Sequence, residues 1–244
     1  MKHKTKFILL ACAGLVFWLW RDVRDIRERG REQHRLHCLD NLCEGDTVPT
    51  GYDWRTEFPF KVNGQWFIGP KDYGGYGGSF AFFWPSKTPR HSKYALQNAP
   101  EFIPSAAGRA SNFYEVAIEI FLRSYERVPN GPSQSWSQIS QQAEAERRVI
   151  SKTTPRAGLE VWRIIDEVFK KPVIWYVATD FRWANGDPPV LFCHDKDPKF
   201  DRCTTGFFWK PGIALDMRFR ARHGIDWPDI YQETMRVLQL LKRV

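Results

Sequence analysis

The sequence predicts an α+β fold. We expect a mainly antiparallel β-sheet of about eight strands in a sandwich-like arrangement, a covering helix at the carboxyl end and a membrane anchor at the amino end. Three observations support this prediction. Short apolar runs alternate with clusters of Gly, Pro and Asp, a helical stripe of apolar side chains follows Trp227, and residues 7–20 carry no charge. The length of 244 residues fits one domain with an appended segment.

We divide the chain into an anchor with a charged stalk at residues 1–36 and a single disulfide-bearing domain at residues 37–244. The uncharged run at residues 7–20 is expected to be an uncleaved anchor, because three lysines precede it and Arg21 follows it. A helix of this length spans about 21 Å, less than the roughly 30 Å of a hydrocarbon core, so the span is marginal. A cleaved signal peptide, or a lipoprotein modified at Cys12, fits less well because the apolar region before either site is too short.

The segment after the anchor mixes charges. Six arginines alternate with four acidic residues between residues 21 and 35, which is typical of a solvated helix. Its Lys/Arg content alone would place this side of the membrane in the cytoplasm, whereas the cysteines favour export. We expect a single pass through a bacterial inner membrane, with the carboxyl-terminal domain in the periplasm. The stalk is then either a plain spacer or a surface that contacts a partner.

The formal net charge of +8 is concentrated at the amino end. Residues 1–36 hold nine Lys/Arg against four Asp/Glu, a net charge of +5, and residues 37–244 hold 27 against 24, a net charge of +3. The predicted domain therefore lacks the basic stripe that neutralises nucleic-acid phosphates, and we expect no nucleic-acid partner. We interpret most of the eleven Trp residues as core.

Four cysteines outside the anchor form two local pairs, Cys38 with Cys43 and Cys193 with Cys203. The spacing of the second pair suits a bridge between adjacent strands across a polar turn. Metal binding is the alternative, in which nearby histidines complete two ligand sets: His34, His37, His194 and His223. No Cys-x-x-Cys occurs, and zinc thiolates belong mostly to reducing compartments. We therefore predict two structural disulfides, no metal and no cofactor, in an exported protein.

Short strands joined by tight turns are expected between Gly51 and Trp84, a stretch rich in aromatic residues and glycine. Asn63-Gly64 predicts a type I′ hairpin turn, because both residues tolerate positive φ. The glycines from Gly74 to Gly78 could cradle a phosphate. No Gly-Lys-Ser/Thr follows them, so we interpret this stretch as a loop or bulge.

Further strands are predicted from apolar runs and alternation. Residues 85–112 read as loop. Residues 113–122 alternate as a half-buried strand, and apolar runs predict four more strands at residues 159–165, 173–179, 190–193 and 206–209. The polar residues 135–148 have a weak apolar face, and we expect an exposed helix or a mobile surface insertion.

The last predicted strand and helix begin at Ile213. Residues 213–222 alternate so that three arginines share one strand face: Arg218, Arg220 and Arg222. A solvated face is the simplest interpretation, and a surface for an acidic partner is the alternative. Asp226 is expected to cap a helix with Pro228 in its first turn, and Lys242 and Arg243 should favour its carboxyl end.

No sequence context indicates a catalytic site. The chain has no Gly-x-Ser-x-Gly, the His194-Asp195 pair lies inside the predicted disulfide turn, and no carboxylate pair can be assigned from sequence. We expect no enzymatic activity.

The carboxyl end resembles a known family. Met217-Arg-Phe-Arg-Ala-Arg-His223, followed by Asp226-Trp-Pro-Asp-Ile-Tyr231 and Val237-Leu-Gln-Leu-Leu241, is similar to the closing strand and helix of bacterial type VI secretion lipase-immunity proteins. Gly51-Tyr-Asp-Trp54, Val62-Asn-Gly64 and the Gly74–Gly78 loop resemble small envelope proteins encoded beside such phospholipase effectors. These motifs are short. Many such proteins are lipoproteins, whereas this chain lacks a convincing lipidation signal at Cys12.

The resemblance implies an immunity protein, a membrane-tethered periplasmic domain that binds a toxic phospholipase effector and blocks its active site or its access to the membrane. Tethering raises the concentration of an inhibitor where a lipase acts. We take as candidate partner-binding residues Arg218, Arg220, Arg222, Trp66, Tyr73 and Tyr76. The alternatives are an envelope carbohydrate- or peptidoglycan-binding module, with stacking platforms at Trp54, Trp66 or Trp84, and a membrane-anchored hydrolase.

Overall fold

The computed structural model describes residues 2–74, 76–91, 116–125, 136–168, 170–183, 186–194 and 202–244. Side chains are described from residue 21 onward within these ranges, except those of Tyr76, Val116, Ala221 and Arg222.

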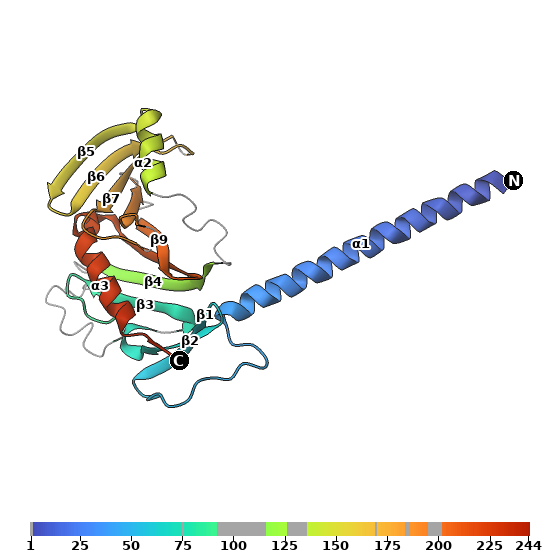
Figure 1. The fold of residues 1–244 in the computed structure, drawn as a ribbon, viewed down its shortest axis with the longest axis horizontal. Coiled ribbons are helices and arrows are strands. Elements are labelled where there is room, and N and C mark those ends of the chain that lie inside the picture. Colours follow the sequence, from blue (N-terminus) through green and yellow to red (C-terminus); the bar gives the residue numbers. More distant parts are fainter. Residues whose placement is uncertain are drawn as a thin grey trace, which may run out of the picture.

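The described residues form an α+β fold (Figure 1). The helices are α1 (Lys2–Asp40), α2 (Trp136–Ala145) and α3 (Trp227–Gln239), and short 3-10 turns lie at η1 (Lys71–Tyr73), η2 (Tyr76–Gly78) and η5 (Ala221–Asp226). The strands are β1 (Glu57–Val62), β2 (Gln65–Pro70), β3 (Ser79–Trp84), β4 (Val116–Ser124), β5 (Val149–Arg156), β6 (Leu159–Ile165), β7 (Pro172–Ala178), β8 (Val190–His194), β9 (Arg202–Lys210), β10 (Ile213–Arg220) and β11 (Lys242–Arg243).

Two antiparallel sheets organise the domain. The large sheet has eight strands in the order β3-β4-β10-β9-β8-β7-β6-β5, and the small sheet has three in the order β1-β2-β11. The predicted class, a mainly antiparallel sheet of eight strands with a carboxyl-terminal helix, is confirmed. The second layer is the small sheet together with α3. Rings join the layers, because Phe60 lies 5.2 Å from Phe80 and Phe67 lies 5.6 Å from Trp209 between ring centroids.

Helix α1 extends from the domain as one straight rod (Figure 1). Its 39 residues correspond to a length of about 58 Å. The predicted stalk helix is therefore present at residues 21–35. Within the part of the chain whose side chains are described, no helix is long and apolar enough to cross a membrane. The side chains of residues 7–20 lie outside that part, and the anchor stays a prediction.

Several strand predictions hold because they rest on local chemistry. Asn63 and Gly64 have φ values of 50° and 70° and join β1 to β2, as the predicted hairpin requires. Strand β10 alternates buried Leu215, Met217 and Phe219 with more exposed polar residues. It ends at Arg220, earlier than predicted, because η5 follows.

Helix α2 confirms the helix predicted within residues 135–148 but is not only a surface insertion. The ring of Trp136 packs edge-on against Trp162 at 5.2 Å and against Trp175 at 5.3 Å, and Ala143 is fully buried. A second core therefore lies between α2 and strands β6 and β7. The apolar periodicity of this helix is weak because a few large aromatic rings pack it against the sheet, in place of a continuous apolar stripe.

Three further features were not predicted correctly. Strand β5 is polar and exposed along most of its length, so it lacks the alternation that marks a strand. Lys242 and Arg243 do not extend helix α3 but form β11 beside β2. Asp226 makes no side-chain cap hydrogen bond. Its Oδ2 instead accepts a hydrogen bond from Trp84 Nε1 at 2.9 Å, a residue 142 positions away.

Candidate binding groove

Hydrogen bonds to backbone groups fix the carboxyl end of helix α1 to the β1–β2 turn and to β4. The Asp40 carboxylate is 6% exposed and accepts hydrogen bonds from the backbone N–H groups of Asn63 at 2.9 Å and Ser124 at 3.0 Å. Gly64 N donates to Leu39 O at 2.8 Å. The helix therefore ends against the β1–β2 turn and the last residue of β4, which sets the direction in which it leaves the domain.

The loop after α1, residues 41–56, folds back over the outer face of β1 and β2. Lys61, on β1, is 8% exposed and donates from Nζ to both carboxylate oxygens of Asp46 at 2.8 and 2.6 Å. Asp46 Oδ2 also accepts from Cys43 N at 2.8 Å. One nearly buried ion pair thus fastens the middle of the loop to the sheet.

A groove of about 720 Å³ lies between this loop and the sheet. Its apolar and aromatic side chains come from both sides, the loop and the strands: Leu42, Val48, Tyr52, Trp54, Phe58, Pro59 and Trp66. Charged side chains interrupt this lining: Asp40, Glu57, Lys61 and Lys71. A concave, mostly apolar surface with a few polar groups is the usual form of a ligand or peptide site.

Trp54 is the most accessible ring of the groove. Its side chain is 67% exposed, and Leu42 and Val48 beside it are 62% and 38% exposed. Arg55 Cζ lies 5.6 Å and Lys71 Nζ 5.7 Å from the centroid of the Trp54 ring, and Lys71 Nζ also donates to Trp54 O. Arg55 forms no ion pair among the described residues, and Lys71 lies near Asp53, whose pKa its charge helps to lower. Exposed aromatic surface beside two cations favours an apolar partner that carries negative charge.

Three carboxyl groups beside the groove have a lowered pKa. Hydrogen bonds from Lys61 lower the pKa of Asp46, the backbone N–H of Arg55 lowers that of Asp53, and Lys242 lowers that of Glu57. A general acid needs a raised carboxyl pKa. These three groups are therefore structural acceptors, and the arrangement is suited to binding.

The predicted partner-binding residues do not form one surface. Trp66 lines the groove. Tyr73 is buried, and its hydroxyl accepts a hydrogen bond from Arg236 at 2.7 Å, so its ring is not available to a partner. Arg218 and Arg220 are exposed on the face of β10 opposite the buried Met217 and Phe219. The side chains of Tyr76 and Arg222 lie outside the described residues.

The arginine face and the groove lie on opposite sides of the large sheet. The small sheet covers the side to which Phe80 and Trp209 point, through the ring contacts already described. Arg218 points to the other side, where its guanidinium carbon lies 5.3 Å from the centroid of the Phe121 ring. One small partner therefore cannot contact both Arg218 and Trp66.

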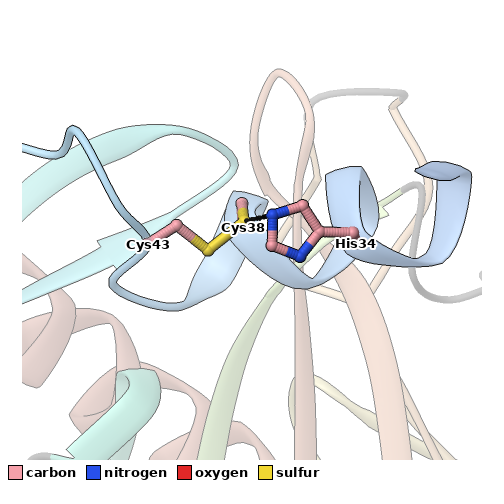
Figure 2. Close-up of side chains that lie close together, drawn as sticks. All are labelled: His34, Cys38 and Cys43. Atoms are coloured by element: carbon pink, nitrogen blue, oxygen red, sulfur yellow. Dashed lines mark hydrogen bonds between the residues drawn. A yellow bond between two sulfur atoms is a disulfide. The ribbon is translucent and has the colours of Figure 1, made fainter. Parts of the chain in front are cut away.

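Both predicted disulfides are present, Cys38–Cys43 and Cys193–Cys203. Cys193 and Cys203 are 1% and 0% exposed and join β8 to β9 inside the sheet. Cys38 and Cys43 are half-buried and join the end of α1 to the loop that lines the groove. Figure 2 shows the ring of His34 beside this bond, with His34 Nε2 3.6 Å from Cys38 Sγ.

The second histidine set that the sequence offered as metal ligands is separated in the fold. His223 Nδ1 lies 3.0 Å from Asp226 Oδ2, next to Trp84, whereas His194 packs its ring edge-on against Phe192 at 5.3 Å. The sulfur atoms of Cys193 and Cys203 are bonded to each other. The Cys193–Cys203 disulfide is therefore a structural crosslink between β8 and β9.

Sequence reasoning named Trp54 and Trp66 as stacking platforms, but it did not bring them together or identify Leu42 and Val48. The available signal was the presence of large apolar residues in a polar, disulfide-bounded loop. The chain matches no protein-family model, no curated protein and no solved structure. The function must therefore be argued from this geometry.

Proposed function

We propose that this protein is a membrane-tethered binding protein that neutralises a toxic phospholipase effector in the periplasm, and that the groove between residues 41–56 and the small sheet receives the effector. The observation that carries the proposal is the 67% exposed Trp54 ring inside a fixed concave surface at the base of α1. Large exposed aromatic side chains in a pocket are typical centres of binding energy.

The position of the groove supports a role close to the membrane. Helix α1 ends at Asp40, and the loop that follows it directly forms one wall of the groove. If residues 7–20 anchor the chain, residues 21–40 of α1 place the groove about 30 Å from the membrane, within reach of an enzyme that acts on the bilayer. Effector and inhibitor are then confined to the same narrow layer, which raises the local concentration of the inhibitor.

The chemistry of the groove supports a partner segment with apolar side chains and at least one carboxylate. Leu42, Val48 and Trp54 supply exposed apolar area. Arg55 and Lys71 place two positive charges at the Trp54 ring, and only Lys71 has a carboxylate nearby, that of Asp53. Occlusion of the effector requires no catalytic group of this chain.

A matched pair of substitutions tests the proposal. Val48→Asp places a charge in the groove, and Val168→Asp places the same charge on the turn after β6, where Val168 is 79% exposed. We expect Val48→Asp to abolish co-purification with the product of the neighbouring gene, tested as the candidate effector, and to abolish growth rescue when both proteins are sent to the periplasm. Val168→Asp should leave both unchanged. Equal binding by the two variants would overturn the assignment of the groove.

A second candidate is supported by a specific observation. Trp54 and Trp66 line the same groove together with Tyr52, and such rings stack on sugars in carbohydrate-binding modules. Trp84 does not belong to this set, because it is 6% exposed and its Nε1 is bonded to Asp226. Binding to peptidoglycan fragments that is lost in Trp54→Ala, with no binding to the phospholipase, would favour this candidate over the first.

A further inference from the structure

Three of the possible metal ligands that the sequence offered, His34, Cys38 and Cys43, lie close together at the end of α1. His34 and Cys38 are four residues apart and therefore share one face of the helix, and Cys43 follows where the chain turns back. One ligand atom from each of the three residues lies within 4.8 Å of the others. His34 is exposed and both cysteines are half-buried, so solvent reaches the cluster (Figure 2).

We propose that reduction of the Cys38–Cys43 disulfide converts this cluster into a zinc site, with Cys38 and Cys43 as thiolate ligands, His34 as the imidazole ligand and water in the fourth position. The proposal does not depend on the function proposed for the groove. It concerns a state of the protein in which the two sulfur atoms are no longer bonded to each other.

The geometry supports zinc. In tetrahedral zinc sites the Zn–S bond is about 2.3 Å and the Zn–N bond about 2.1 Å, so a sulfur and a nitrogen ligand of one ion lie about 3.6 Å apart. His34 Nε2 already lies 3.6 Å from Cys38 Sγ. Two sulfur ligands need about 3.8 Å by the same geometry, and rotation of the Cys43 side chain after reduction can provide that separation.

His37, one helical turn from His34, is not part of the cluster. His37 Nδ1 lies 3.3 Å from Asn41 Nδ2, and the same amide donates to His37 O at 2.8 Å. His37 therefore sits beside a different partner on the helix. Its substitution provides a control for the substitution of His34.

Reduction of the Cys38–Cys43 disulfide proceeds by thiol–disulfide exchange. A dithiol reductant gives two electrons and two protons to the Cys38–Cys43 bond and becomes a disulfide itself. Zinc then displaces the two thiol protons, so its binding releases acid and weakens as the pH falls. Cys193–Cys203 should resist the same reductant, because its sulfur atoms are shielded by the sheet, whereas those of Cys38–Cys43 are accessible.

The first measurement is selective reduction of the detergent-solubilised full chain, with Cys12→Ser in every variant so that only four cysteines remain. Alkylation followed by mass spectrometry should locate the new thiols at Cys38 and Cys43 while Cys193 and Cys203 stay oxidised. The far-ultraviolet circular dichroism should stay unchanged. Simultaneous reduction of both bonds, or loss of the fold on reduction of the first, would overturn the proposal.

The second measurement is zinc binding by equilibrium dialysis and elemental analysis. The reduced protein should bind one zinc ion per chain and the oxidised protein none. Cobalt in place of zinc should give the visible absorption of a tetrahedral thiolate site. His34→Ala should weaken zinc binding at least about tenfold, and His37→Ala should leave it unchanged. A reduced protein that binds no zinc, or that binds it equally after His34→Ala, would contradict the assignment.

Discussion

At one end of the large sheet, helix α2 packs on β6 and β7 through aromatic rings (Figure 1). At the other end, hydrogen bonds join helix α1 to the small sheet, and an ion pair joins the loop after α1 to the same sheet. The first contact buries Trp162, Trp175 and Ala143. At the other end, the Asp40 carboxylate accepts hydrogen bonds from backbone N–H groups, and the Asp46 carboxylate neutralises Lys61.

The two ends therefore differ in what can weaken them. Apolar packing does not depend on pH or on redox state, and it contributes to stability in proportion to the area that is buried. The polar end contributes less free energy per contact, but its geometry depends on the charge of two carboxylates and on one accessible disulfide. The groove lies at the polar end, where binding residues are held on a loop by a few defined contacts.

The largest effect is expected at the aromatic end. Trp162→Ala removes a ring that is 3% exposed and leaves a cavity beneath α2. We expect a loss of about 3–5 kcal/mol in the free energy of unfolding, measured by denaturant titration. Trp162→Phe keeps most of the ring volume and should lose less. If both variants were as stable as the parent, α2 would not be part of the folded core.

A smaller effect is expected where α1 meets the small sheet. Asp40→Ala leaves the backbone N–H groups of Asn63 and Ser124 without their acceptor, at a cost of about 1–3 kcal/mol. Asp40→Asn keeps an oxygen acceptor and should recover part of the loss. Faster amide exchange at Asn63 and Ser124 in the alanine variant would locate the effect, and unchanged exchange would show that α1 is not fixed there.

Acid should open the polar end first. The pKa of Asp46 is lowered by its hydrogen bonds from Lys61, so the stabilisation from this carboxylate is present above its ordinary pKa of 3.8 and is lost as the pH falls below that value. We expect the protection of amides within residues 41–56, relative to their intrinsic exchange rate, to fall below about pH 4, while protection in β6 and β7 stays high. Asp46→Asn should lack this acid step. If amide protection in residues 41–56 of the parent protein did not change with pH, the role assigned to Asp46 would be contradicted.

The smallest effect on stability is expected for Trp54→Ala. Because this ring is 67% exposed, its removal should change the free energy of unfolding by no more than about 0.5 kcal/mol. The contrast with Trp162→Ala separates a ring that holds the fold from a ring that is available for binding. A large loss of stability in Trp54→Ala would show that the groove wall itself needs this ring.

The sequence by itself determined the features that depend on near neighbours along the chain. Positive φ at Asn63 and Gly64 turns the first hairpin, and alternation places Met217 and Phe219 on the buried face of β10. The Cys193–Cys203 pairing follows from a short polar turn between two strands. The class of the fold follows from many such local signals, which explains why it was predictable.

Only the tertiary structure decided the groove and the fastening of its walls. Glu57 is bonded to Lys242, 185 residues away, and Asp40 accepts from Ser124, 84 residues away. Contacts of this kind leave no periodic mark in the sequence, because the side chains meet through the pairing of distant strands. The aromatic packing of α2 was missed for the same reason, because Trp136 meets Trp162 only when the sheet forms. Strand β5 was missed for a different reason: it is an exposed edge strand without apolar alternation, although its partner β6 is the next strand in the chain.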